Sequence, residues 1–161
     1  MSPTSKRVVR LITLAVLAAA SVSVAVAQKA TAKATENKAA DKPLYMEYKG
    51  VRIGMDMDEA RKKLGEPTDK SDVQDFFMFS ETESCQVFYD KGHKVMAVSI
   101  NYVGEASGAP LPKVVLGTDI EAKADGAMYK MIRYPDSGYW VSYNRTGGDD
   151  PLVTVTMQKI Q

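Results

Sequence analysis

The chain has 161 residues, of which 45% are hydrophobic and 8% aromatic, enough for one ordinary domain or two very small ones. Its 21 Lys and Arg against 20 Asp and Glu give a net charge of +1 without a basic run, which excludes an electrostatic nucleic-acid binder. One His and one Cys are too few for a His/Cys zinc cage. We therefore expect no metal site and no cofactor.

Residues 1–27 have the pattern of a secretory signal peptide. Three basic residues precede an apolar run, 11–20, that is too short to span a bilayer, which needs about 20 residues. The segment ends in a small-residue A-x-A site at Ala27. Gln28 stands where a lipoprotein has its cysteine, so we expect no covalent lipid anchor. The sequence predicts a periplasmic or secreted protein, cleaved near Ala27/Gln28.

The next segment, residues 28–43, is predicted to be a flexible linker. It carries no large apolar side chain and cannot bury enough surface to offset the entropy of ordering. Beyond it, residues 44–161 hold 14 basic and 18 acidic residues, a net charge of −4. We expect this part to be a single folded unit.

A short helix is predicted over residues 57–64. Asp56 is placed to cap the first turn with its side chain, and Glu59 to reach back as in a capping box. Gly65 is expected to end the helix in the left-handed conformation, and Pro67 blocks its continuation.

Three strand-like segments follow the helix. An aromatic run covers 76–79, an alternating pattern covers 85–89, and a β-rich stretch covers 95–102, with a turn at 90–92. A short helix followed by three strands is an α+β unit.

The same order of elements then returns in weaker form. Setting Leu64–Gly65 against Leu116–Gly117 places 109–116 opposite the first helix, where two prolines predict a short or irregular helix. The expected fold is α+β, with two tandem helix-plus-antiparallel-hairpin repeats that form one curved antiparallel sheet with short helices on one face. The first repeat covers 44–104, and a degenerate second repeat covers 105–161.

The stretch 50–67, GVRIGMDMDEARKKLGEP, followed by an aromatic strand and a hairpin, resembles the SmpA/OmlA (BamE-like) domain family. A tandem pair of such units is similar to the fold of the beta-lactamase inhibitor protein. The resemblance implies two helix-plus-sheet units that form one concave surface. The shared stretch encodes a capped helix rather than an active site.

Catalytic patterns are missing from the sequence. His93 is the only imidazole and follows Gly92 in a predicted turn, and no G-x-S-x-G elbow is present. Asp149 and Asp150 are adjacent in a Gly-rich turn, where they bend the chain rather than act as acid and base. We expect no catalytic residues and no enzyme activity.

Cys85 and the methionines are interpreted as core residues. Cys85 shares a strand face with Val87 and Tyr89, which predicts a buried thiol in a monomer, with an intermolecular disulfide dimer as the alternative. Seven methionines are expected to fill gaps in the core rather than bind copper: Met55, Met57, Met78, Met96, Met128, Met131 and Met157.

Strand alternation separates two faces of the expected sheet. One face carries apolar residues, namely Val87, Tyr89, Tyr139, Val141 and Tyr143, and is taken as the buried one. The other face is the candidate partner-binding surface, formed by Gln86, Phe88, Trp140, Ser142 and Asn144. Aromatic side chains among polar ones are typical of partner surfaces. The alternative is that the linker or a helix covers them.

These observations favour an exported, non-catalytic binding or scaffold module of the bacterial cell envelope whose partner is a protein, either in the envelope or an exported enzyme. One alternative is a secreted enzyme inhibitor that inserts a loop, 136–138 or 145–151, into an active site. A second is a carrier of a small ligand or lipid with an apolar cavity behind 76–79. A third is an enzyme with a deep pocket around His93.

Overall fold

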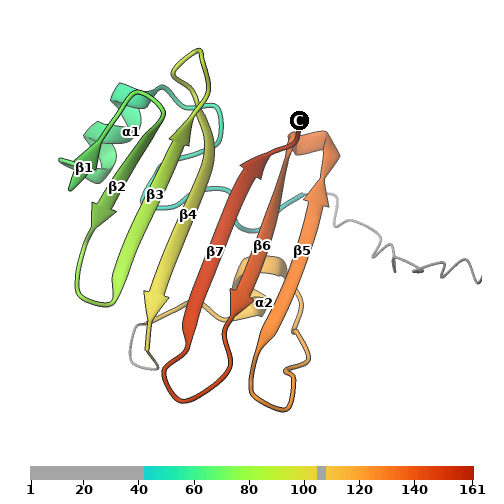
Figure 1. The fold of residues 1–161 in the computed structure, drawn as a ribbon. Coiled ribbons are helices and arrows are strands. Elements are labelled where there is room, and N and C mark those ends of the chain that lie inside the picture. Colours follow the sequence, from blue (N-terminus) through green and yellow to red (C-terminus); the bar gives the residue numbers. More distant parts are fainter. Residues whose placement is uncertain (1–41, 105–107) are drawn as a thin grey trace, which may run out of the picture. The chain divides into compact units, whose positions relative to one another are not determined.

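In the computed structural model, residues 42–104 and 108–161 are described, and the predicted signal peptide and residues 28–41 of the predicted linker lie outside them. In these described residues, seven strands form one sheet and two short helices pack beside it; Figure 1 shows their arrangement. The elements in chain order are α1 (Met57–Leu64), β1 (Asp69–Lys70), β2 (Gln74–Met78), β3 (Glu83–Tyr89), β4 (Val95–Val103), α2 (Pro112–Leu116), β5 (Met128–Tyr134), a 3-10 turn (Pro135–Ser137), β6 (Tyr139–Arg145) and β7 (Leu152–Lys159).

All neighbouring strands of the sheet are antiparallel, and their order is β1-β2-β3-β4-β7-β6-β5. Each run of strands is a meander of hairpins, and the two runs meet where β4 pairs with β7. This confirms the coarse prediction of an α+β fold with one antiparallel sheet. The sequence pattern missed β5, because its MYKMIRY stretch lacks a regular alternation of apolar and polar residues.

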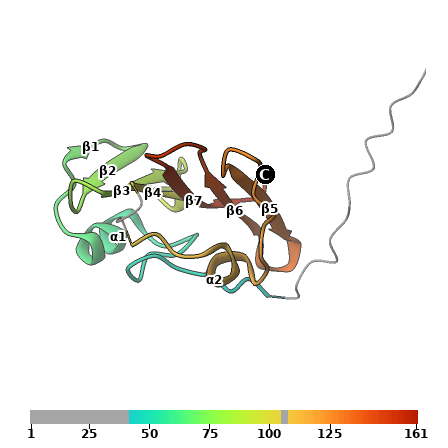
Figure 2. The ribbon, with the colours of Figure 1, turned by 90° about the horizontal axis from the view of Figure 1, so that it is seen from below.

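Both helices and the segment 42–56 lie on one side of the sheet, as Figure 2 shows. Met57 and Ala60 of α1 and Val115 and Leu116 of α2 are buried against the sheet. The core therefore fills the space between the helices and one sheet face. Pro43, which the sequence pattern placed at the end of the linker, is also buried.

The first helix spans the predicted residues, but its ends differ from the prediction in two details. Asp56 makes no side-chain cap bond; its carboxylate instead accepts a hydrogen bond from Lys94 Nζ at 2.7 Å. A charged partner is a stronger attraction for a carboxylate than a free amide. Gly65 has φ 90° and ψ −163°, so it takes up a positive φ but not the left-handed helical conformation.

The second helix has five residues and begins at Pro112, which agrees with the predicted short helix. Proline fits the first turn of a helix because the amide it lacks has no partner there. Gly117 ends the helix in the left-handed conformation. Within the described residues, no helix is long and apolar enough to cross a membrane.

Candidate functional site

The side of the sheet that faces away from both helices is the candidate site, and we call it the open face (Figure 2). The strand register orders its side chains in three rows that run across the sheet, because directly paired residues point to the same side. The first row is Gln74, Phe88, Ala97, Gln158, Trp140 and Arg133; the second is Phe76, Gln86, Ser99, Thr156, Ser142 and Met131; the third is Met78, Ser84, Asn101, Thr154, Asn144 and Tyr129.

The five residues predicted as a partner-binding surface all lie on this open face. Phe88 and Trp140 share the first row, Gln86 and Ser142 the second, and Asn144 belongs to the third. Ser142 is 8% exposed and the other four are half-buried. Their strand neighbours on the opposite side, such as Val87 and Val141, are fully buried.

Two central strands contribute site residues that the sequence reasoning missed. Ser99 of β4 and Thr156 of β7 place their hydroxyl oxygens 3.2 Å apart, and Thr154 Oγ1 donates to Asn101 Oδ1 at 2.9 Å. These bonds hold the polar side chains of β4 and β7 in fixed positions. Small polar and apolar residues alternate in 97–102 and 152–157, and this pattern predicts that Ser99, Asn101, Thr154 and Thr156 share the polar face.

The three rows contain one formal charge, Arg133 on the edge strand β5. At the other edge, Asp69 of β1 pairs with Phe76 and points to the same side. The strands between these two edges contribute only apolar, aromatic, hydroxyl and amide side chains to the rows. A quarter of the chain is charged, so this absence of charge from the centre of a face is a specific feature of the molecule.

Methionines take part in the open face, which corrects the prediction that they all fill the core. Met55, Met57 and Met157 are buried as expected. Met78 and Met131, in contrast, are 60% and 42% exposed, because strand register turns them away from the helices.

A buried ion pair on the helix side was also missed by the sequence reasoning. The carboxylate of Asp75 is fully buried and accepts hydrogen bonds from Arg61 Nε at 2.7 Å, Arg61 Nη2 at 2.9 Å and the Tyr89 hydroxyl at 2.8 Å. Burial by itself raises the pKa of Asp75, but these hydrogen bonds outweigh it and hold the pKa below its usual value. Arg61 Nη2 also donates to the carbonyl of Ser71. With every partner satisfied, this group joins α1 to β2 and β3 and is not open to a ligand.

Two signals in the sequence could have found this pair. Asp75 lies two residues before the buried Phe77 and so faces the core, where a carboxylate needs a cation. Arg61 lies four residues after Met57, on the buried side of α1.

Cys85 is buried in β3 with 0% exposure, as predicted. Burial raises the pKa of its thiol to about 12. Because a disulfide forms through an exposed thiolate, the thiol of the folded chain is not accessible to a second molecule.

The residues considered for catalysis lie apart from one another. His93 is exposed in the turn between β3 and β4, with φ 59°. Asp149 and Asp150 are exposed in the loop between β6 and β7. The described residues contain no group of three or more His, Cys, Asp or Glu side chains arranged to hold a metal ion.

The two loops considered for an inhibitor lie at opposite ends of the sheet. The first, 136–138, lies in the connection between β5 and β6, and the second, 145–151, runs from the last residue of β6 to β7 (Figure 1). Successive hairpin loops of a meander alternate between the two ends, so the loops cannot enter one active site together.

An apolar cavity behind β2 was considered for a carrier. The side chain of Phe77 occupies this position; it is 2% exposed and stacks on Phe79.

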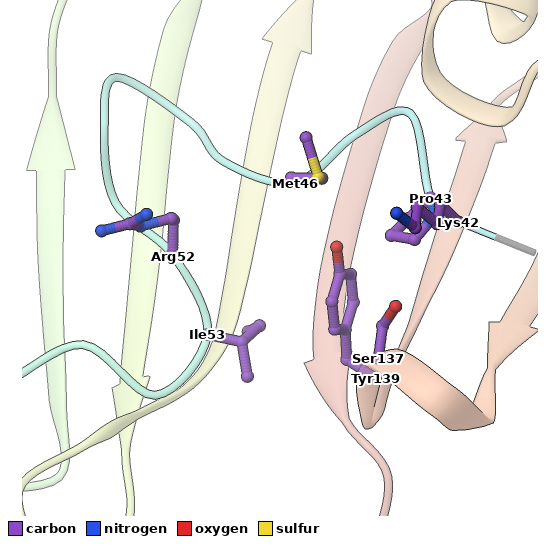
Figure 3. A pocket seen from close by; sticks show the side chains of 7 residues that line it. All are labelled: Lys42, Pro43, Met46, Arg52, Ile53, Ser137 and Tyr139. Atoms are coloured by element: carbon purple, nitrogen blue, oxygen red, sulfur yellow. The ribbon is translucent and has the colours of Figure 1, made fainter.

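A shallow cavity of 310 Å³ lies on the helix side, next to the start of β6. Figure 3 shows its lining, which consists of Lys42, Pro43, Met46, Arg52, Ile53, Ser137 and Tyr139. The Tyr139 hydroxyl donates a long hydrogen bond, 3.4 Å, to the carbonyl of Tyr45. The Arg52 guanidinium points away from Tyr139 and Ser137 (Figure 3), so the polar groups do not converge on one point.

No family model, no curated protein and no solved structure matches this chain.

Proposed function

We propose that this chain is an exported, non-catalytic binding module of the bacterial cell envelope, and that it engages a protein partner through the open face. The observation that carries the proposal is the row-ordered, uncharged centre of that face, where Phe88 and Trp140 stand among amide and hydroxyl side chains.

The composition of the open face supports a protein partner. Protein interfaces are depleted of charged residues at their centres and enriched in Trp, Tyr, Phe and Met. A sheet face that only meets water is normally dotted with Lys and Glu, since about a quarter to a third of a typical surface is charged. The centre of the open face has the composition of an interface centre. Its charged residues, Asp69 and Arg133, lie at the two edges of the sheet, as in the polar rim of an interface.

Phe88 and Trp140 are suited to be the anchors of the contact. They lie in one row with Ala97 and Gln158 between them, three strand spacings apart, which amounts to about 14 Å. Ala97, between them, has the smallest side chain of the row. The two rings are therefore separated by one small and one amide side chain, and aromatic residues of this kind dominate the binding energy of many interfaces.

The absence of central charges predicts how binding responds to salt. An uncharged contact is not screened, so its affinity changes little between low and high ionic strength. A contact with a membrane surface or a nucleic acid, in contrast, weakens steeply with salt.

The experiment is affinity capture from envelope extract with immobilised wild-type protein, Phe88→Ala, Trp140→Ala and the control Val114→Ala. Val114 lies on α2 and is 61% exposed on the opposite side of the molecule. A protein retained by wild type and the control but lost by both aromatic variants is then purified, and its affinity for each variant is measured by calorimetry at two salt concentrations.

The proposal predicts at least a tenfold loss of affinity for each aromatic variant, since a hot-spot side chain contributes about 2 kcal/mol or more. Equal recovery of every protein by all four forms would refute the proposed surface. Emission from Trp140 that is already fully blue-shifted in the isolated protein would also contradict it, because the ring would then be covered.

We also propose that the two halves of the sheet are tandem SmpA/OmlA-like repeats. Each half is a short helix that ends in Leu-Gly, at Leu64–Gly65 and Leu116–Gly117, followed by an antiparallel meander. The strand order is mirrored about the β4–β7 junction: β4, β3 and β2 follow one another on one side, and β7, β6 and β5 on the other. A pseudo-twofold relation between the halves requires this order. An experimental structure in which the strands of the two halves do not superpose in sequence order would contradict this.

Export is the third part of the proposal. Its support is the sequence pattern of residues 1–27. The amino-terminal sequence and mass of the protein recovered from the periplasm or the medium test it. A mature protein that begins at Gln28 agrees with the proposal, and a full-length protein retained in the cytoplasm contradicts it.

A further inference from the structure

The two edges of the sheet differ in length. β1, at one edge, has two residues, which is the usual way to make an edge unattractive for pairing. β5, at the other edge, has seven, and no other strand of the described chain pairs with its outer side. An edge strand of that length presents a row of backbone N–H and C=O groups to a further strand.

β5 also exposes apolar side chains beside this row of backbone groups. Tyr129 is 60% exposed and Met131 is 42% exposed, both on the open face. On the helix side of the same strand, Met128 and Ile132 are only partly buried. A strand added to this edge would cover apolar surface on both sides of the sheet.

We propose that the partner of this edge is β5 of a second copy of this chain, paired antiparallel about a twofold axis through Met131. Opposed residues in an antiparallel pair point to the same face, so in a symmetric pair one residue has to lie directly opposite its own copy. The twofold axis then passes midway between these two copies, and we name the axis after that residue. With the axis at Met131, Tyr129 of each copy faces Arg133 of the other, and Lys130 faces Ile132.

Other positions of the axis fit less well. An axis at Lys130 or Arg133 sets two like charges directly opposite each other, which destabilises a strand pair. An axis at Ile132 sets Tyr129 against Pro135, which has no N–H to donate. An axis at Met128, Tyr129 or Tyr134 leaves only a few residues paired. Met131 is the position that opposes no like charges and keeps the whole strand in the pair.

Charged side chains on an edge strand normally disfavour pairing with another strand. In this register, however, Arg133 of β5 makes a contact across the strand pair. The guanidinium of Arg133 meets the ring of Tyr129 in a cation–π contact, and symmetry provides two such contacts. The Lys130 ammonium groups lie diagonally rather than opposite. Because a single strand pair is a small interface, the association is expected to be weak and visible only at high protein concentration. This dimer does not depend on the proposed function, since it uses the edge of the sheet and not its face.

The first test is sedimentation equilibrium of the purified protein over a range from micromolar to several hundred micromolar. The mass of the wild type is expected to rise toward twice that of the monomer. Met131→Lys, which sets two ammonium groups against each other, should remain monomeric. Met78→Lys, a change at an exposed methionine on the same face but on β2, should behave as the wild type.

A second test does not depend on a loss of association. Met131→Cys places one thiol at the axis, and Val114→Cys places one on the exposed side of α2; Cys85 is buried and does not interfere. Under mild oxidation, Met131→Cys is expected to give a disulfide dimer on a non-reducing gel and Val114→Cys is not.

A wild type that is monomeric at every concentration overturns the proposal. So does a dimer that persists in Met131→Lys, or one that is lost in Trp140→Ala, which would place the contact on the open face. Equal cross-linking of the two cysteine variants overturns it as well.

Discussion

Replacing Arg61 by Met removes the cation from the buried ion pair with Asp75 and keeps most of the side-chain volume. Asp75 is 0% exposed, and two of its hydrogen bonds come from the Arg61 guanidinium. In the variant, the carboxylate keeps only the Tyr89 hydroxyl and the Ser71 amide as partners. A buried charge is then left without its counterion.

The size of the effect follows from this burial. Removing one partner of a buried ion pair costs about 3–5 kcal/mol. The Arg61 side chain is 16% exposed, so some water can reach the place it leaves. We therefore expect the free energy of unfolding at neutral pH to fall by about 3 kcal/mol, the lower end of that range.

The pH dependence separates the charge effect from a packing effect. In the wild type, the pKa of Asp75 lies below its ordinary value of 3.8, so its stabilising contribution is present above that value and is lost as the pH falls through the native pKa. Without Arg61, burial raises the pKa instead, and the charged carboxylate destabilises the variant above pH 3.8. The stability difference between the two proteins should therefore be largest near pH 7 and shrink below pH 4.

Urea unfolding of wild type, Arg61→Met and the control Lys62→Met at pH 7 and pH 3 measures this difference. Lys62 is the exposed neighbour of Arg61 on α1, and its replacement should cost less than about 0.5 kcal/mol. In an Asp75→Asn background, Arg61→Met should cost less than in the wild type, because no charge is left unpaired. A loss below about 1 kcal/mol at pH 7, or a loss that does not change with pH, would refute the reasoning.

Three further predictions concern the core. Because burial raises the pKa of Cys85 to about 12 from an ordinary 9.0, iodoacetamide at pH 8 should alkylate the native protein about a thousandfold more slowly than the urea-unfolded one; comparable rates would place the thiol at the surface. Leu116→Ala should lower the stability by about 2–5 kcal/mol in urea unfolding, and Val114→Ala on the same helix by less than about 0.5, since Leu116 is 3% and Val114 61% exposed. Equal losses would mean that α2 does not pack as described. Tyr48→Phe removes the 2.6 Å hydrogen bond to Glu83 and should cost about 1.5–3 kcal/mol, whereas Tyr129→Phe should be neutral; thermal melts of the two variants that coincide would contradict this.

Some features of the fold followed from local patterns. The helix over 57–64 was predicted from its flanking residues, because helix ends depend on residues a few positions away. The strand around 85–89 was predicted from its alternation and the strand around 95–102 from its β-forming residues; alternation also assigned Phe88 and Trp140 to the same side as Gln86. The strand β5 was missed, since each of its faces mixes apolar side chains with one charged side chain and the stretch shows no period of two in polarity.

The sequence by itself determined which residues of a predicted strand or helix share a face, because that depends on neighbours within the same strand or helix turn; it did not determine that Met78 and Met131 face away from the core. Only the tertiary structure decided which strands pair, and with them the three rows of the open face: the pairing of Ser99 with Thr156 joins residues far apart in the chain. The burial of Asp75 was decided in the same way, because a carboxylate enters a core only where a distant residue, here Arg61, supplies the opposite charge. Periodicity is a local property, whereas register and charge pairing are properties of contacts between distant segments.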